Sequence, residues 1–225
     1  MRPKHKRLVT RAWRWLRPVV VVVVVTCALR SAVADWNDVP TGSMNPTIVE
    51  GDRVFVNKLA YDLKVPFTSW RLARWSGPQR GDIVTFYSPA DGKRLIKRVI
   101  GLPGDLIEMR YEELILNGQP VPIRMLESAG AATDQRWIGQ EGLPGREHPV
   151  QVTPAVAARR NFAPLRVPPG QYFVMGDNRD RSFDSRYFGC VHADRITGKA
   201  LAVAISVDRE NWYLPRWRRF FTPLP

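Results

Sequence analysis

The chain has 225 residues, of which 44% are hydrophobic and 24% are charged, and its formal net charge is +13. This composition excludes a largely disordered chain and a multi-span membrane protein, and the length allows one sizeable domain with an elaboration. Two cysteines and three histidines exclude a disulfide scaffold and leave few ways to build a histidine-based metal site. We expect neither a metal nor another cofactor.

The basic residues are concentrated at the N-terminus. Residues 1–34 contain eight Lys and Arg and no acid. The remainder of the chain therefore contains 26 of the 34 basic residues and all 21 acidic ones. A basic chain is typical of proteins that bind nucleic acid or a membrane surface. Because the excess flanks the apolar run Val19–Leu29, the charge favours a phospholipid membrane as partner and not nucleic acid.

This apolar run has two interpretations. It contains 11 residues, whereas a comfortable span needs about 20. One interpretation is a membrane anchor over 13–34, in which two arginines snorkel toward the headgroups, behind a cytoplasmic basic tail at 1–12. The other is a cleaved signal peptide ending at Ala32-Val33-Ala34. Under both interpretations, residues 35–225 are exported across the membrane.

The exported part is predicted to be mainly β. Short segments rich in β-branched and aromatic residues lie between Gly, Pro and Asp turns, and we see no long amphipathic helix after residue 35. Leu114-Ile115-Leu116 followed by Asn117-Gly118 predicts a hairpin. The other predicted strands are Val54–Val56, Asp82–Tyr87, Leu95–Ile100, Tyr172–Met175 and Ala200–Val207.

These elements predict bent antiparallel sheets that form a β-barrel-like core from residues 35–118 and 167–210. Residues 119–166 are rich in Pro, Gly, Ala and Arg and show weak alternation, so we interpret them as an inserted cap or small subdomain. Residues 211–225 form a basic and aromatic C-terminal tail. The tail segment 212–221 and the segment 66–75 both mix aromatics with arginines, which suits either lipid headgroups or packing on the core.

The first segment that could carry chemistry is 40–47, in which Ser43 lies between Gly42 and Pro46. It is not the Gly-x-Ser-x-Gly elbow of α/β hydrolases. Taken alone, the segment favours an ordinary Ser/Thr/Gly/Pro turn over a catalytic loop.

The second segment is 94–105. In a strand, Lys97 shares one face with Leu95 and Val99, and burial there would lower the pKa of its amine toward the neutral form that a general base requires. The alternative is an edge strand whose lysine lies in water.

The third segment, 175–189, alternates three aspartates with three arginines. The acids lack the spacing of a calcium loop. The segment is either a structural ion-pair network or a scaffold that holds a hydroxyl, Ser182 or Ser185, beside a catalytic group.

Together these segments resemble the type I signal peptidases, the bacterial leader peptidases that use a Ser-Lys pair. The matching motifs are Thr-Gly-Ser-Met-Asn-Pro-Thr at 41–47, Arg-Gly-Asp-Ile-Val at 80–84, Ile-Lys-Arg-Val-Ile-Gly-Leu-Pro-Gly-Asp at 96–105 and Gly-Asp-Asn-Arg-Asp-Arg-Ser-Phe-Asp-Ser-Arg-Tyr at 176–187. The resemblance implies a membrane-bound serine endopeptidase that removes signal peptides from exported preproteins after Ala-x-Ala sites.

The resemblance also implies a location and partners. The apolar segment would be one retained transmembrane helix in the inner membrane, with the N-terminus cytoplasmic and the catalytic domain on the periplasmic side. The partners would be preproteins carrying signal peptides, phospholipid and, indirectly, the export machinery.

By the same resemblance, Ser43 is the nucleophile and Lys97 is the base. Ser182 orients the lysine amine, and the Ser43 backbone N–H with the Thr41 hydroxyl forms the oxyanion hole. The resemblance gives a structural, ion-pairing role to Arg98, Asp177, Asp184 and Arg186. The residues that flank the two catalytic positions, and are therefore candidates to line the substrate pocket, are Val39, Pro40, Met44, Ile48, Leu95 and Ile96.

Three features depart from the family pattern. Thr41 stands where serine is common, a proline is missing at Gly189-Cys190-Val191-His192, and 119–166 does not align by eye. The alternatives are a specialised peptidase that matures one pilin or conjugation protein, a repressor-type Ser-Lys autoprotease, and a non-enzymatic basic binding module. A Ser-His-Asp hydrolase that uses His148 or His192 is a further alternative.

Overall fold

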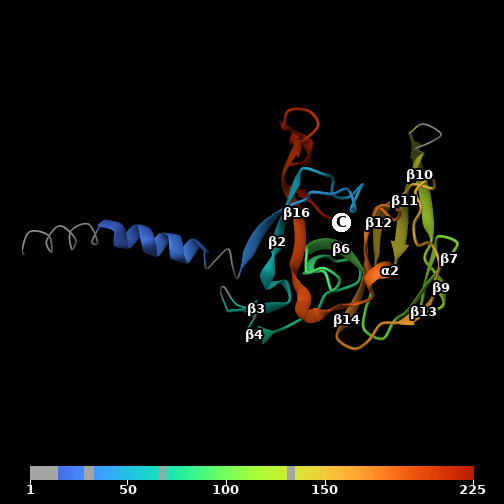
Figure 1. Cartoon of the computed structure of the whole chain (residues 1–225), viewed down its shortest axis with the longest axis horizontal. Coiled ribbons are helices and arrows are strands. Elements are labelled where there is room, and N and C mark those ends of the chain that lie inside the picture. The colour runs from blue at the N-terminus through green and yellow to red at the C-terminus, as the bar shows by residue number, and fades with distance from the viewer. Residues whose placement is uncertain (1–14, 28–32, 66–67, 69, 131–134) are drawn as a thin grey trace, which may run out of the picture.

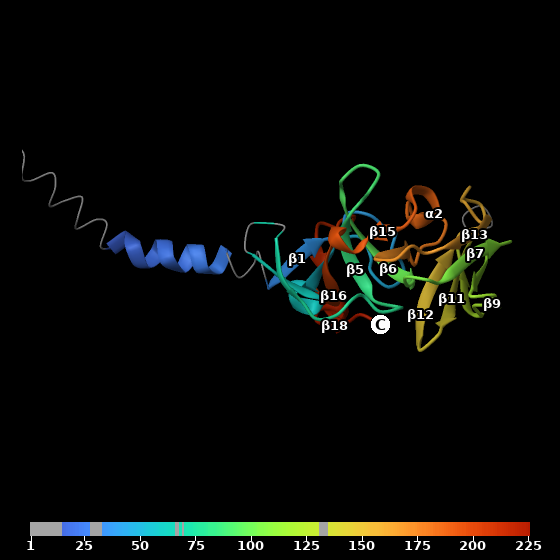
Figure 2. The same cartoon turned by 90° about the horizontal axis from the view of Figure 1, so that it is seen from below.

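The computed structural model describes residues 15–27, 33–65, 68, 70–130 and 135–225. Residues 15–27 form a helix whose side chains are exposed, and this helix projects away from the β-sheets (Figures 1 and 2). Among the residues described, no helix has the length and apolar character that a membrane span requires. The predicted tail at 1–12 lies outside these residues, and the transmembrane helix over 13–34 stays a prediction.

The main sheet is built from nine strands, and its ladders are antiparallel. In spatial order the path is β1 (Ala34–Asp38), β2 (Asp52–Asn57), β16 (Ile196–Asp208), β5 (Ile83–Tyr87), β6 (Arg94–Gly101), β14 (Gln171–Met175) and β15 (Val191–His192). Two short strands, β17 (Leu214–Pro215) and β18 (Thr222–Pro223), also pair with β16. Register shifts along β16 mark bulges, which bend a strand and increase its twist.

A second group of strands lies beside the main sheet (Figure 1). One sheet has the order β13 (Phe162–Arg166), β7 (Leu106–Arg110), β8 (Glu113–Leu116) and β9 (Gln119–Pro120), and the other has β10 (Ile123–Ala129), β11 (Arg136–Leu143) and β12 (Arg146–Val152). Residues 119–166 therefore contribute strands to both sheets.

The remaining elements are short. They are β3 (Asp62–Lys64), β4 (Arg71–Arg74), η1 (Lys58–Ala60), α2 (Ser185–Phe188), η2 (Ala193–Arg195) and η3 (Trp217–Arg219).

The mainly β prediction is confirmed, and each predicted strand falls within β2, β5, β6, β8, β14 or β16, with Asp82 one residue before β5. Asn117 and Gly118 both have positive φ, of 52° and 79°, and join β8 to β9 as the predicted hairpin. After residue 35, the longest helix in the described part is the four-residue α2.

Three apolar clusters hold the sheets together. The first joins β7 and β8 to Phe173 and Met175 of β14, so it links the second group of strands to the main sheet. The second lies around Val84, Val99 and Val174 in the middle of the main sheet. The third packs the loop between β1 and β2 against β2 and β5. The segment that carries Ser43 is thereby anchored by buried apolar side chains.

The C-terminal tail folds back onto the main sheet (Figure 1). Arg219 donates to the buried Asp52 at 3.1 and 2.6 Å, and Leu224 packs against the third cluster. The aromatic side chains of Trp212, Trp217 and Phe221 nevertheless remain 92%, 72% and 77% exposed. The tail therefore packs on the core through its arginine and leucine while it presents its aromatic rings to the surroundings.

Candidate active site

Ser43 lies in the loop between β1 and β2. The loop turns tightly, because the backbone N–H of Asn45 donates to Gly42 and that of Ile48 donates to Met44. Asn178, from the loop after β14, holds it in place: its side chain donates to the Gly42 carbonyl at 2.9 Å and its backbone N–H to the Ser43 carbonyl at 3.2 Å. Segments 40–47 and 175–189 are thus in direct contact.

Lys97 lies on β6, and its amine reaches Ser43. Lys97 Nζ donates to Ser43 Oγ at 2.6 Å and to the Ile96 carbonyl oxygen at 3.0 Å. The lysine is 2% exposed and Ser43 is 8% exposed. The strand therefore turns Lys97 away from solvent, so the interpretation of an edge strand with a solvated lysine is wrong.

Burial lowers the pKa of the Lys97 amine from its ordinary value to about 8. The carboxylates of Asp184 and Asp177 act in the opposite direction, and the Arg186 guanidinium adds to the lowering. With a pKa near 8, an appreciable fraction of the amine is neutral at neutral pH. A neutral amine within hydrogen-bond reach of a hydroxyl can accept its proton and leave an alkoxide-like nucleophile.

A small cavity of about 200 Å³ opens beside this pair. One wall comes from β1 and the loop that follows it, and the other wall comes from β6 and the residues before it. The lining residues are Asn37, Asp38, Val39, Pro40, Thr41, Ser43, Val54, Thr85, Lys93, Arg94, Leu95, Ile96 and Lys97. Four of the six residues that the sequence suggested for the pocket are in this set, and so is Thr41.

The pocket prediction needs a correction at Met44 and Ile48. Both side chains are 0% exposed and pack in the third cluster against Val54, Val56 and Ile83, so neither lines the cavity. The reason is the tight turn that begins at Gly42, which directs both side chains to the inner face of the sheet while Ser43 faces the cavity.

Ser182 lies next to the pair without bonding to it. Its hydroxyl is buried and has no hydrogen-bond partner among the described residues, so the predicted hydrogen bond to the Lys97 amine is not formed. A Cβ added to Gly176 would lie 2.3 Å from both Ser182 Oγ and the Ser43 carbonyl oxygen. Only a glycine at 176 therefore lets these two groups approach each other.

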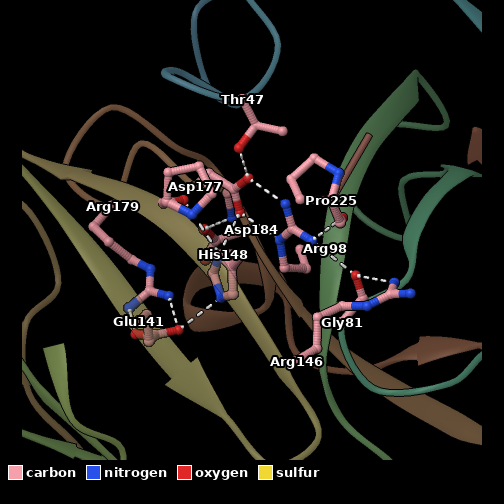
Figure 3. A network of polar contacts seen from close by, with 12 residues as sticks. Thr47, Gly81, Arg98, Glu141, Arg146, His148, Asp177, Arg179, Asp184 and Pro225 are labelled. Atoms are coloured by element: carbon pink, nitrogen blue, oxygen red, sulfur yellow. Dashed lines mark hydrogen bonds and ion pairs between the residues drawn. The ribbon is translucent and has the colours of Figure 1, made fainter. Parts of the chain in front are cut away.

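Arg98, the residue after Lys97, points to the opposite side of β6 and is fully buried. It forms a two-pronged ion pair with Asp177, at 2.9 and 2.8 Å, and also donates to the carbonyl oxygens of Gly81 and Pro225 (Figure 3). Thr47 donates to the same carboxylate. Because five donors in this set are satisfied internally, the guanidinium and its counter-ion form a rigid support below the Ser43 loop.

Asp184 and Arg186 form the second ion pair that the loop motif suggested. The Arg186 guanidinium donates to Asp184 at 2.8 and 2.9 Å, and the backbone N–H of Gly176 donates to the same carboxylate at 3.0 Å. Ser185 instead caps the end of β14, because its hydroxyl accepts the N–H of Val174. This pair therefore fixes the segment that carries Gly176 and Ser182.

Sequence reasoning missed a buried charge cluster from residues 119–166. Glu141 on β11 accepts from the Arg179 guanidinium at 2.6 and 2.5 Å, and His148 on β12 contacts Glu141 at 3.0 Å and Asp177 at 3.5 Å (Figure 3). Glu141 and His148 are both 0% exposed. The available signal was the alternation Gly139, Glu141, Leu143, which places the acid on the inward face of a strand.

The histidines do not support a Ser-His-Asp arrangement. His148 is committed to Glu141, and His192 lies on the surface beside Asp194 at 3.2 Å. Across the described part of the chain, no group of three or more His, Cys, Asp or Glu side chains could hold a metal ion.

A serine hydroxyl bonded to a buried lysine amine is the arrangement of serine hydrolases whose base is lysine. The chain belongs to the signal peptidase family, peptidase S26, whose family model matches residues 12–205. It is therefore a serine endopeptidase of that family.

Two named relatives agree with this assignment. Signal peptidase I of Pseudomonas fluorescens is 36% identical over 90% of this chain and 75% of its own length. Signal peptidase I V of Bacillus subtilis is 35% identical over 82% of this chain and 94% of its own length. A crystal structure of a signal peptidase I from Enterococcus faecalis is 35% identical, covers 54% of this chain and 95% of that chain, and has a TM-score of 0.34.

Glu141→Gln tests the buried cluster. Burial opposes the charge of Glu141, but Arg179 and His148 outweigh it and hold the pKa of the carboxyl at about 2. A carboxyl whose pKa is lowered on folding stabilises the protein at pH values above its pKa in the unfolded chain, about 4.3. This stabilisation is lost as the pH falls toward 2. The substitution should therefore cost about 3 kcal/mol at pH 7 and less at pH 3, measured by urea unfolding at both pH values.

Glu147→Gln is the matched control, because Glu147 lies six residues away and is exposed. It should leave the free energy of unfolding within about 0.5 kcal/mol of the wild type. Equal losses for the two variants would contradict the role assigned to the cluster.

Proposed function

We propose that this chain removes N-terminal signal peptides from exported preproteins, cutting after Ala-x-Ala sites, with Ser43 as nucleophile and Lys97 as general base. The observation that carries the proposal is the 2.6 Å bond between Lys97 Nζ and Ser43 Oγ at the wall of a small, largely apolar cavity. The names of the relatives, signal peptidase I, give the substrate class.

The proposed reaction has two halves. In the first, neutral Lys97 takes the proton of Ser43 Oγ as the oxygen attacks the scissile carbonyl, and the ammonium then protonates the departing amine of the mature protein. In the second, the amine takes a proton from water as the water oxygen attacks the acyl-enzyme, and the ammonium then returns that proton to Ser43 Oγ as the ester bond breaks and the signal peptide leaves. Lys97 ends neutral, so no net proton is stored on the enzyme.

The tetrahedral intermediate of each half needs donors for its oxyanion. We assign this role to the Ser43 backbone N–H and the Thr41 hydroxyl, because both residues border the cavity. A donor of this kind typically contributes about 3 kcal/mol of transition-state stabilisation. Threonine keeps the hydroxyl that serine would supply, with a narrower choice of rotamers.

The substrate would bind as an extended strand between the two walls of the cavity. β1 pairs only with β2, and β14 pairs with β6 only from Arg98 onward, so within the described residues both walls keep a free strand edge. In an extended peptide, alternate side chains face the same side. The two alanines of Ala-x-Ala would therefore enter the cavity together, and its small volume favours small side chains.

Ser182 is proposed to orient the Lys97 amine during the reaction, after a rotation of its side chain. A buried hydroxyl without a partner is costly, which favours such a rearrangement once substrate fills the cavity. Asp177, Asp184, Arg186 and Arg98 hold the surrounding loops and take no direct part in the chemistry.

The proposed location is the inner membrane. Residues 13–34 would be a single-pass anchor behind the cytoplasmic tail 1–12, with the catalytic core, 35–118 and 167–210, on the periplasmic side. From Arg30 to Ser43 the chain spans at most roughly 45 Å, so the site lies near the bilayer surface. The exposed helix over 15–27 and the exposed aromatics of the tail at 211–225 suit contact with lipid.

The catalytic assignment is tested by cleavage of a preprotein with an Ala-x-Ala site, using the full chain in detergent or lipid. Ser43→Ala and Lys97→Ala should each lower kcat/KM by at least 1,000-fold, because each removes one half of the same proton transfer. The wild type should cut directly after the second alanine, as read by mass spectrometry of the products.

Ser128→Ala is the control, because Ser128 is exposed on β10 and does not line the cavity. It should retain most of the activity. Activity in folded Lys97→Ala would show that another group is the base, and an inert wild type would refute the proposed substrate class.

The pH dependence tests the base independently. The pKa of the Lys97 amine is about 8, so below pH 8 most of the amine is protonated and cannot accept the Ser43 proton. The value of kcat/KM should therefore fall tenfold per pH unit below that point and level off above it. If they fold, the His148→Ala and His192→Ala variants should show the same fall of kcat/KM below pH 8. A limb near pH 6.5 that disappears in one of them would favour a histidine base.

A further inference from the structure

The far end of the cavity is charged, in contrast to its apolar middle. Arg94 lies three residues before Lys97 on β6, and its guanidinium reaches across to β1. It donates to the side chain of Asn37 and, through Nη1 and Nη2, to Asp35 at 3.4 Å. The two walls are thus bridged twice, by Lys97 and Ser43 at one end and by Arg94 with Asn37 and Asp35 at the other.

The spacing of the two bridges matches a short stretch of substrate. Three residues of a β-strand span about 10 Å. A substrate strand with its scissile carbonyl at Ser43 therefore brings its fourth residue before that bond to the level of Arg94. The first and third residues, which are the two alanines, face the apolar part between the bridges. The fourth residue faces the other side of the substrate strand, as Arg94, three residues from Lys97, does on β6.

Arg94 retains capacity to bind a substrate group. A guanidinium has five N–H donors, and the contacts to Asn37 and Asp35 use three of them. Its side chain is 37% exposed, and it lines the cavity. Asp35 is also contacted by Lys58 at 3.4 Å, so its negative charge is shared between two cations.

The surrounding charges favour an acidic side chain of the substrate. Asp38, the acid among the lining residues, is paired with Arg209 at 2.5 Å. A carboxylate that arrives at this end meets an incompletely satisfied guanidinium, whereas an ammonium meets a positive charge. The effect is moderate, because the site is partly open to water.

We propose that Arg94 is a specificity-determining residue that selects the fourth substrate residue before the scissile bond, favouring Glu or Asp and disfavouring Lys or Arg. This inference rests on the proposed function and deepens it. It concerns a position outside the Ala-x-Ala motif, and a residue outside the pair that carries out the chemistry.

The test uses one preprotein with its Ala-x-Ala site kept and Glu, Gln or Lys at the fourth position before the cut. The full chain in detergent at low ionic strength should show a Glu to Lys ratio of kcat/KM of about tenfold. Arg94→Gln should reduce this ratio below twofold, and Arg94→Glu should invert it. Thermal unfolding of each variant reports whether the fold is intact.

Lys93→Gln is the matched control, since it removes the same charge one residue away. Lys93 is 79% exposed and is paired with Asp91 at 3.2 Å, so the ratio should change less than twofold. An equal loss in Lys93→Gln and Arg94→Gln would mean that general positive charge sets the preference, and it would overturn the proposal.

Two other results are decisive. A wild-type ratio near one, with efficient cleavage of all three substrates, overturns the role of Arg94 and leaves the proposed function intact. A wild type that cuts none of the three substrates refutes the proposed function, and the role of Arg94 falls with it.

Discussion

The removal of one lysine amine from water is the constraint on which the site depends. Lys97 is 2% exposed and has its only described acceptors in Ser43 and the Ile96 carbonyl. Water stabilises an ammonium far better than this environment does, so burial lowers the pKa to about 8. The fold thereby supplies, at ordinary pH, a partly neutral amine where a lysine in water would be almost entirely protonated, as the proposed role of Lys97 as base requires.

Much of the surrounding structure limits the effect by which neighbouring carboxylates would raise the pKa of that amine and favour its protonated form. Asp177 and Asp184 both favour the ammonium, but each carboxylate is already paired, with Arg98 and with Arg186. Consecutive residues of β6 serve opposite purposes, since Lys97 faces the cavity and Arg98 faces the ion pairs. The strand period of two is what separates them.

The second group of strands has a part in this support. Glu141 on β11 neutralises Arg179, and His148 on β12 joins that pair to Asp177 (Figure 3). Each charge in this buried chain has a partner, which is the condition under which buried ions are tolerated. Residues far from Ser43 in the sequence therefore hold the loop that contacts it.

The sequence predicted the parts of the site that local pattern determines. Alternation at Leu95, Lys97 and Val99 allowed an inward-facing lysine, which the family resemblance then favoured, and the Asn117-Gly118 pair predicted the hairpin between β8 and β9. Both features depend on residues next to each other in the chain.

The sequence did not predict the features that depend on packing between segments far apart in the chain. The strands β10 to β12 carry Gly139 and Pro149, which weaken a β pattern, although Gly139 is required because a Cβ there would lie 2.6 Å from Ile123. The inward turn of Met44 and Ile48, and the pairing of Glu141 with Arg179, depend on segments that meet only in the fold.

The central claim concerns the pKa of one amine, so a direct titration tests it best. Lysine labelled with carbon-13 at Cε can be followed by NMR across pH 6 to 11 in the Ser43→Ala protein, where the account predicts no turnover, with Lys97→Arg used to assign the signal. The account predicts a Lys97 pKa near 8. A value at or above the ordinary 10.4 or so would contradict it, because the amine would then be charged whenever the enzyme works.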